Sequence, residues 1–203
     1  VNYYYLLQYD KAIDNYKKSL AQDILEGNNF GIGSGLDNIA IVYLDEGKYD
    51  SANVYDLKAI PYFIKSNNQP GLARIYGNRG DILMKLYDAK SAYEFYSKSL
   101  AINTKLNITD GIGSDYADIG AMYLDLAKDT AKKFIVSPSM EMNKEALLQK
   151  AKYNLMKAIE PDKESGDMQV QMNLYNILSE TEEQLGNYRT ALKYHKDYTS
   201  FKD

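Results

Sequence analysis

The sequence contains no cysteine and no tryptophan, and only one histidine, in 203 residues. Without cysteine the chain can form neither a disulfide framework nor a thiolate metal site. With only one histidine, His195, the chain lacks the residues for most kinds of zinc site and of histidine-dependent catalytic site. The missing cysteines do not decide between periplasm and cytosol, because proteins of both compartments can lack them; the periplasm is slightly favoured.

The sequence also lacks a basic stretch and a long apolar stretch. A net charge of −4 argues against nucleic-acid binding, which depends on clustered lysine and arginine. No run of about 18 apolar residues is present, so we expect no membrane span within this chain. The sequence starts with VNYYYLL and without methionine, from which we expect a fragment of a longer chain.

Three of the 13 glycines fall in the stretch GIGSG at 31–35. A phosphate-binding loop would need a strand before it and a helix after it, and the pattern contains no such strand. GIGS returns at 111–114, and GLAR stands between them at 71–74, so the interval is 40 residues twice. Such recurrence indicates a repeat protein. We interpret GIGSG as a connector between helix pairs and predict no cofactor.

Each repeat reads as two amphipathic helices joined by a short turn. Leu36, Ile39, Ala40 and Tyr43 lie on one face of a first helix, which EGKYD at 46–50 interrupts. The second helix has the apolar positions Tyr49, Ala52, Tyr55, Ala59 and Ile60.

The repeats predict an all-α fold of antiparallel helix pairs that stack into an α-α superhelix. We expect close packing where Ala or Gly in the first helix faces Ala in the second, and a positive φ at the turn residues Gly47 and Gly186. We predict one array over the whole chain, in which a partial repeat is followed by four repeats, the third with an insertion near 129–147: 1–30, 31–70, 71–110, 111–167 and 168–203.

The insertion shows helical spacing through Phe134, so we expect the first helix to run on and to break at Ser137 and Pro138. The alternative is an adaptable contact made by Met140 and Met142. We interpret PDKESGD at 161–167 as a solvated connector.

Several residues depart from the repeat. Arg79 stands at an apolar core position and Asp56 at an aromatic one, and we expect each to weaken its own copy. Pro61 should kink or end its helix. His195 stands at a position where an aromatic residue packs, so we expect it to be packed. Two further departures are Tyr87 at a turn glycine and Glu182 at a tyrosine position.

The pattern of Leu36, Ala40, Tyr43, Gly47 and the alanines of the second helix resembles the tetratricopeptide repeat (TPR). The 40-residue period is similar to the extended variety in bacterial peptide-sensing regulators and sensor regions of histidine kinases. The resemblance implies that the superhelix is right-handed. It also implies a non-enzymatic scaffold that binds a protein or peptide, with an adjoining signalling domain possible in the full-length chain.

The same resemblance implies that the first helices of the pairs line a concave groove. In peptide-binding members an asparagine in this groove binds the ligand backbone, because its side-chain amide both donates and accepts hydrogen bonds. Nearby Lys or Arg residues hold the carboxylates of the ligand. Each residue could equally be an ordinary polar residue on a solvated helix face. The predicted groove residues are Ser34, Asn38, Asp45, Arg74, Asn78, Asp81, Lys85, Asp118, Asp125 and Asn173.

Three functions therefore stay open at the level of the sequence. The first is a peptide-binding or protein-binding scaffold in a signalling chain. The second is a structural assembly scaffold with permanent partners. The third is an enzyme that holds a nucleotide at GIGSG, and the missing strand argues against it.

Overall fold

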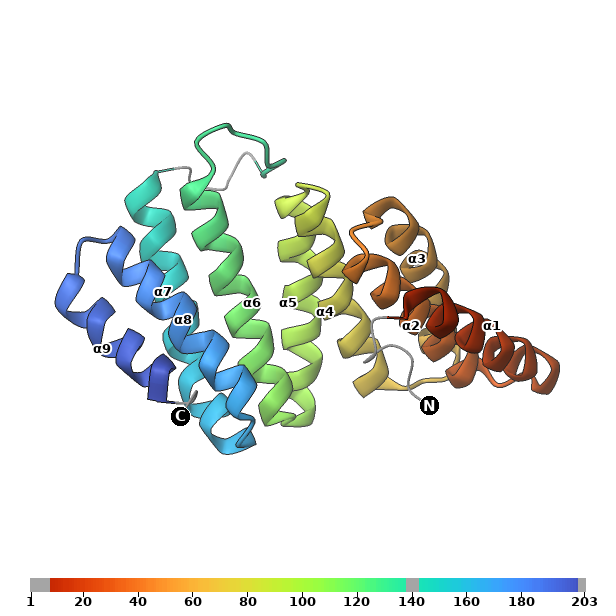
Figure 1. Cartoon of the computed structure of the whole chain (residues 1–203). Coiled ribbons are helices and arrows are strands. Elements are labelled where there is room, and N and C mark those ends of the chain that lie inside the picture. The colour runs from red at the N-terminus through yellow and green to blue at the C-terminus, as the bar shows by residue number, and fades with distance from the viewer. Residues whose placement is uncertain (1–7, 138–142, 201–203) are drawn as a thin grey trace. The chain divides into compact units, whose positions relative to one another are not determined.

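The computed structural model describes residues 8–137 and 143–200, and within these ranges all regular structure is α-helical. Successive helices pack in antiparallel pairs, as predicted (Figure 1). In chain order the helices are α1 (Tyr9–Glu26), α2 (Asn29–Asp45), α3 (Tyr49–Lys65), α4 (Gln69–Lys85), α5 (Ala89–Leu106), α6 (Thr109–Lys128), α7 (Lys144–Ser165), α8 (Met168–Gln184) and α9 (Tyr188–Ser200).

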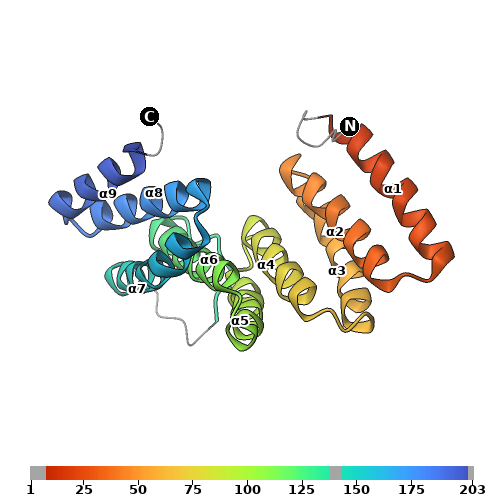
Figure 2. The same cartoon turned by 90° about the horizontal axis from the view of Figure 1, so that it is seen from below.

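The chain forms two compact units, Val1–Leu86 (unit 1) and Tyr87–Asp203 (unit 2). In unit 1, α2 packs against α3, and α1 and α4 pack on either side of this pair (Figure 2). In unit 2, the pairs are α6 with α7 and α8 with α9, and α5 packs on α6. The repeat boundaries given above stay predictions.

Short turns join the helices, and the backbone conformation of these turns recurs at equivalent positions of the repeat. Gly47 and Gly186 have φ of 73° and 77°, which confirms the positive φ predicted for both turns. Gly27, Asn67 and Asn107 also have positive φ, and they are spaced by 40 residues in the connections before α2, α4 and α6. Glycine and asparagine adopt this conformation at the lowest cost.

The interpretation of GIGSG as a connector is wrong, because residues 31–35 lie inside α2. The helix begins at Asn29, and the Asn28 side chain caps it by accepting a hydrogen bond from the Gly31 N–H. The glycines nevertheless serve close packing: a Cβ on Gly33 would lie 3.2 Å from the Phe63 ring.

The predicted extension of the first helix through Phe134 is also wrong. Helix α6 ends at Lys128, and the following loop is closed by the Asp129 carboxylate, which accepts from the Phe134 N–H at 3.1 Å. The Ile135 N–H donates to the Tyr87 carbonyl at 2.7 Å, and the Phe134 and Tyr87 rings meet edge to face. Met140 and Met142 lie outside the described residues.

The predicted solvated connector at 161–167 is mostly helix. Helix α7 includes Pro161 and continues to Ser165, and Asp162 is buried. Only Gly166, with φ of 70°, and Asp167, which caps α8, lie between the two helices. Pro61 likewise does not end α3, which continues to Lys65.

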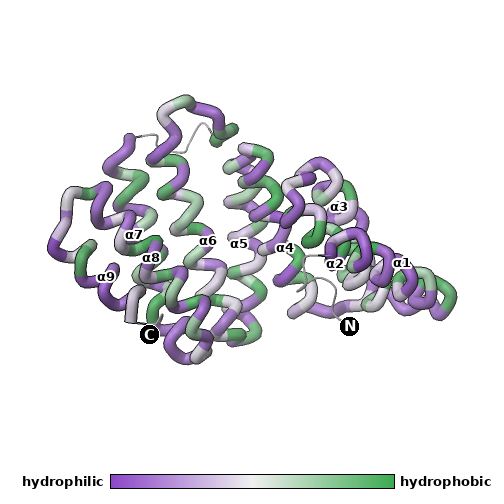
Figure 3. Tube along the Cα trace, viewed as in Figure 1, coloured by the Kyte–Doolittle hydropathy of each residue, from purple (hydrophilic) through white to green (hydrophobic). Residues whose placement is uncertain are grey.

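Small residues bring paired helices close together, as predicted. Apolar and polar residues alternate along the helices (Figure 3). In unit 1, Ala40 and Ala52 are buried in one cluster with Ile82. In unit 2, a Cβ on Gly120 would lie 2.6 Å from Leu155 Cγ, so α6 and α7 approach more closely than any other side chain would allow.

In α1, α3 and α7, one position of the second helix packs against the first helix of the next pair, and we call it the junction position. In α1 it is Tyr16, which packs against a buried cluster that includes Ile39 of α2. In α7 it is Leu155, which shares a buried cluster with Leu178 of α8. These contacts are apolar, as the repeat pattern predicts.

In α3 the junction residue is Asp56, and it meets Arg79 of α4. Both are buried, and Arg79 Nη1 donates to Asp56 Oδ2 at 2.7 Å and to Asn53 Oδ1 at 3.0 Å. Burial raises the pKa of Asp56 to about 6 against the opposing effect of Arg79. The two departures from the repeat are therefore partners and do not act separately.

Glu182 and His195 are two other residues that depart from the repeat. Glu182 is buried and accepts from Lys152 of α7 at 2.8 Å and from Asn187 at 2.7 Å. The packing prediction for His195 is wrong, because its side chain is exposed and its ring lies 5.8 Å from that of Tyr198.

We predict that Gly120→Ala lowers the free energy of unfolding by about 1–3 kcal/mol, because the new methyl group overlaps the buried Leu155. The matched control is Gly35→Ala in α2, where the added Cβ would meet Leu20 at an ordinary 3.4 Å. There the better helix propensity of alanine should stabilise the protein by about 0.5–1 kcal/mol. Urea denaturation measures both, and equal effects would contradict the close approach of α6 and α7.

We predict that Asp56→Leu and Arg79→Leu each lower the free energy of unfolding by about 3 kcal/mol, because each leaves one buried charge without its partner. The double variant copies the Leu155 and Leu178 contact and should regain at least the stability of the original pair. A double-mutant cycle in urea gives the coupling, and additive losses would show that the two residues act independently.

Candidate functional site

Two of the predicted groove residues of unit 1, Arg74 and Asn78, meet at a residue that was not predicted from the sequence. Asp37 of α2 is fully buried, and its carboxylate accepts hydrogen bonds from Arg74 Nη1 and, at 3.0 Å, from Asn78 Nδ2. Burial raises the pKa of Asp37, and Arg74 and Asn78 oppose this effect. Helices α2 and α4 thus present a polar cluster fixed by one buried carboxylate.

Arg74 is held on two sides and still faces solvent. Its guanidinium carbon lies 5.7 Å from the centre of the Phe63 ring, and its ion pair with Asp37 fixes one nitrogen. The side chain is nevertheless 45% exposed, whereas Asp37 is completely covered. The remaining guanidinium donors are therefore available to a ligand in a defined orientation.

The surroundings of Arg74 offer two further kinds of contact. Asn38 is half-buried and makes no side-chain hydrogen bond within residues 8–137 and 143–200, so its amide can donate and accept. The Ser34 hydroxyl is buried and likewise has no partner among these residues. Phe30, at the start of α2, is 46% exposed and meets the Phe63 ring edge to face.

The other predicted residues of unit 1 lie nearer the ends of the two helices. Asp81 is half-buried in α4, and Lys85 is exposed at its last turn. Asp45 is exposed at the end of α2. The structure therefore brings Arg74 and Asn78 together at Asp37.

In unit 2 the predicted residues Asp125 and Asn173 are exposed, and Asp118 is half-buried. Other polar residues of α8 are used inside the unit: Glu180 pairs with Lys128, and the Gln184 amide oxygen accepts from Lys144 at 2.9 Å.

A pocket in unit 2 lies at the end of α6, where the loop that follows this helix lines it together with Tyr87 and Asp125. It measures about 360 Å³ and is open to solvent. The lining residues are Tyr87, Asp125, Lys128, Asp129, Thr130, Ala131, Lys133 and Phe134.

A signal for Asp37 exists in the sequence, although its partner is not readable there. Asp37 interrupts the apolar face around Leu36, Ile39 and Ala40, so the helical spacing alone places a charge beside the core. The partners Arg74 and Asn78 lie 37 and 41 residues away in the chain. Their approach depends on how α4 packs against α2.

Asp115 of α6 is a second buried carboxylate that the sequence analysis missed. It accepts from Asn103 Nδ2 of α5 at 2.7 Å, and burial raises its pKa to about 6 against the opposing hydrogen bonds of Ser99 and Asn103. Among the described residues no group of acidic or histidine side chains is arranged to hold a metal ion. None of the described helices is long and apolar enough to cross a membrane.

The consecutive antiparallel pairs, joined by tight turns and packed through small residues, define a TPR-like helical-repeat fold. No family model and no curated protein matches the chain. The crystal structure of BtubC (BKLC) from P. vanneervenii is similar with a TM-score of 0.73 at 15% identity, over 96% of this chain and 73% of that chain. The crystal structure of MamA protein is similar with a TM-score of 0.56 at 20% identity, over 95% and 82% of the two chains. Identities this low concern the fold alone.

We predict that Asp115→Asn stabilises the protein at pH 8. The folded-state pKa of Asp115, about 6, exceeds the reference value of 3.8. The stability that protonation of the Asp115 carboxyl group contributes is therefore fully present below pH 3.8 and is lost as the pH rises through 6. Asparagine retains the acceptor for Asn103 without the buried charge. At pH 8 the variant should gain about 1–3 kcal/mol in free energy of unfolding.

The stability gained by Asp115→Asn should shrink as the pH falls toward 4. Urea denaturation at several pH values measures this change. The control is Asp110→Asn, an exposed position at the start of the same helix, which should change stability by less than about 0.5 kcal/mol. A gain that is independent of pH would show that charge burial at Asp115 is not the cause.

Proposed function

We propose that this chain is a non-enzymatic binding scaffold, and that α2 and α4 of unit 1 bind an extended segment of a partner protein or a peptide. The proposal rests on the position of the Arg74 side chain. Asp37 and Phe63 hold this side chain in place, and 45% of it stays exposed. A guanidinium fixed before binding loses little conformational entropy when a ligand arrives.

The ligand that suits this site carries a carboxylate. Arginine has five N–H donors in a planar fork, and Asp37 occupies only part of them. A charge-assisted hydrogen bond to a ligand carboxylate would use the exposed remainder. The amide of Asn38 would then bind a peptide group of the same ligand, and the exposed ring of Phe30 would pack against an apolar side chain.

The chemistry of the cluster supports binding and not catalysis. Asp37, the carboxylate at its centre, is committed to Arg74 and Asn78 and is fully covered. It is therefore not placed to take a proton from a ligand, as a general base must. The Ser34 hydroxyl has no basic partner within the described ranges, so nothing there activates it as a nucleophile.

The resemblance to sensor regions extends this proposal to a place in a signalling chain. In such a chain, peptide binding at unit 1 would report to an adjoining signalling domain. The sequence of the complete gene tests this part: an adjoining kinase or DNA-binding module supports it, and an assembly operon without either favours a structural scaffold.

We predict that Arg74→Gln weakens peptide binding by at least about tenfold, the loss of one charge-assisted hydrogen bond. The probes are peptides selected from a random 12-residue display library against the chain and then synthesised, and fluorescence anisotropy measures their affinity. We expect the selected peptides to contain Asp, Glu or a required free C-terminus. Asn38→Ala should also weaken binding.

The matched control is Lys17→Gln, which removes an exposed cation from α1 in the same unit. It should leave the affinity within about twofold, because rim charges contribute little. Failure to select any peptide, or selected peptides that bind Arg74→Gln as tightly as the original chain, would contradict the proposal.

A further inference from the structure

Met156 lies on the surface of α7 in unit 2, directly after the junction residue Leu155. Its side chain is 45% exposed. Leu57 holds the same place in α3, directly after the junction residue Asp56, and is 49% exposed although α4 packs on α3. The exposure of Met156 therefore belongs to this position of the repeat and does not depend on which helix comes last.

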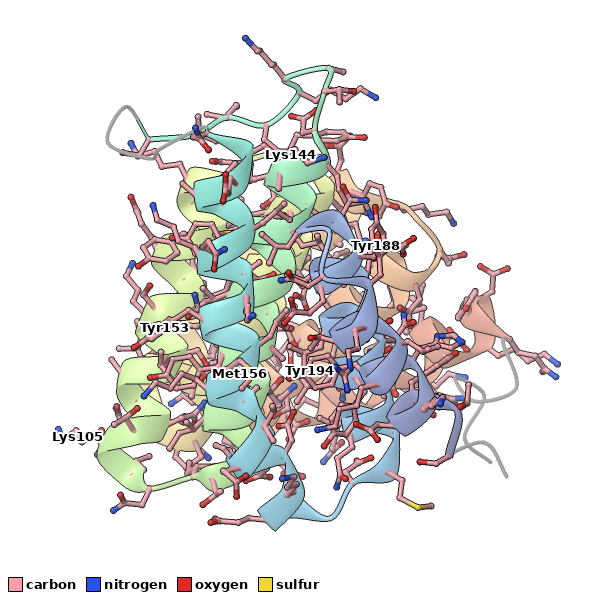
Figure 4. All side chains as sticks on the ribbon, turned by 90° about the vertical axis from the view of Figure 1, so that its left-hand side faces the viewer. Lys105, Lys144, Tyr153, Met156, Tyr188 and Tyr194 are labelled. Atoms are coloured by element: carbon pink, nitrogen blue, oxygen red, sulfur yellow. The ribbon has the colours of Figure 1, made fainter. Side chains whose placement is uncertain are left out.

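The Met156 sulfur accepts a hydrogen bond from α9. The Tyr194 hydroxyl donates to Met156 Sδ at 3.3 Å, and the two side chains lie side by side between α7 and α9 (Figure 4). Tyr194 also packs against a buried cluster that includes Leu155 of α7 and Leu178 of α8, and its ring stacks on that of Tyr175. Helix α9 itself packs on α8, so Tyr194 extends its contacts to α7.

The acceptor in this hydrogen bond can be changed by chemistry. A thioether sulfur is a weak acceptor. Oxidation converts it to a sulfoxide, a polar group whose oxygen accepts hydrogen bonds far better. Because Met156 is exposed, the added oxygen needs no space in the core, and the Tyr194 hydroxyl that already donates to the sulfur is within its reach.

We propose that Met156 is a site of reversible oxidation by a hydroperoxide, and that its sulfoxide holds α9 to α7 more firmly than the thioether does. A lone pair of the sulfur attacks one peroxide oxygen, and the S–O bond forms as the O–O bond breaks. The leaving oxygen takes the proton of the transferred oxygen, so hydrogen peroxide is reduced to water while the sulfur is oxidised. Methionine sulfoxide reductases reverse the reaction. This response lies in unit 2 and is independent of the peptide site proposed for unit 1.

Two other methionines of unit 2 separate exposure from the contact with Tyr194. Met122 of α6 is 1% exposed, so peroxide does not reach its sulfur in the folded chain. Met168, the first residue of α8, is 65% exposed, whereas the Tyr194 hydroxyl bonds to Met156. We expect both exposed methionines to be oxidised and only Met156 to change how α9 is held.

The test uses two variants of the whole chain, one that keeps Met156 and one that keeps Met168. Leucine replaces the other of the two, because exchange of methionine for leucine conserves volume. After treatment with hydrogen peroxide, mass spectrometry of proteolytic peptides locates the added oxygen, and native-state hydrogen exchange measures the opening of α9. Both variants keep Met122, and both carry leucine at Met84, Met140, Met142 and Met172.

In the chain that keeps Met156, oxidation should slow the exchange of α9 amides at least about threefold, the effect of one net hydrogen bond. Incubation with methionine sulfoxide reductases for both epimers and dithiothreitol should restore the original rate. In the chain that keeps Met168, the rate should stay the same after oxidation. Met122 should remain unmodified in both.

The variant Tyr194→Phe, made in the chain that keeps Met156, tests the role of the hydroxyl. Phenylalanine retains the ring that stacks on Tyr175 and removes the donor to Met156. Oxidation should then no longer slow the exchange of α9. Circular dichroism checks that the variant is folded, and the comparison of the two methionine variants tests the proposal without it.

Three results would overturn the proposal. The first is protection of Met156 from peroxide to the same degree as Met122. The second is an exchange rate of α9 that is unchanged or faster after oxidation of Met156. The third is slower exchange that persists in Tyr194→Phe, which would show that the hydroxyl takes no part.

Discussion

The structure depends on how the second helix of each pair meets the first helix of the next. One residue of the second helix makes this contact, and it is Tyr16 in α1, Asp56 in α3 and Leu155 in α7. Each packs against or bonds to residues of the helix that follows it. Since a repeat buries its apolar face against its neighbours and not within itself, these contacts decide which pairs of helices hold together.

The proposed binding site follows from the same packing. When α4 packs on the α2 and α3 pair, Arg74 is brought to Asp37, and Arg79 is brought to Asp56. The first ion pair lies at the edge of the contact, so Arg74 remains half-exposed, whereas the second lies inside it and stabilises the junction. A single helix thus supplies one arginine to the core and another to the proposed binding site.

Sequence periodicity predicted the helix pairs and the turns, and it failed where the local pattern was ambiguous. Gly47 and Gly186 have the positive φ expected of turn residues, because glycine adopts this conformation without a steric penalty. GIGSG was interpreted as a connector, since its glycines favour turns. These glycines lie inside α2 instead, where Gly33 is in close contact with Phe63. The helical spacing through Phe134 was coincidental, and the loop is held by Tyr87, 47 residues earlier.

The sequence by itself determined that this chain is all-α and built from repeated helix pairs, because hydrophobic spacing and turn glycines are local properties. It also placed Asn38, Arg74 and Asn78 on solvated helix faces. Only the tertiary structure decided which of these residues meet, since Asp37 and its partners are far apart in sequence. It likewise decided that Asp56 is buried, because its partner Arg79 comes from α4, 23 residues later in the chain.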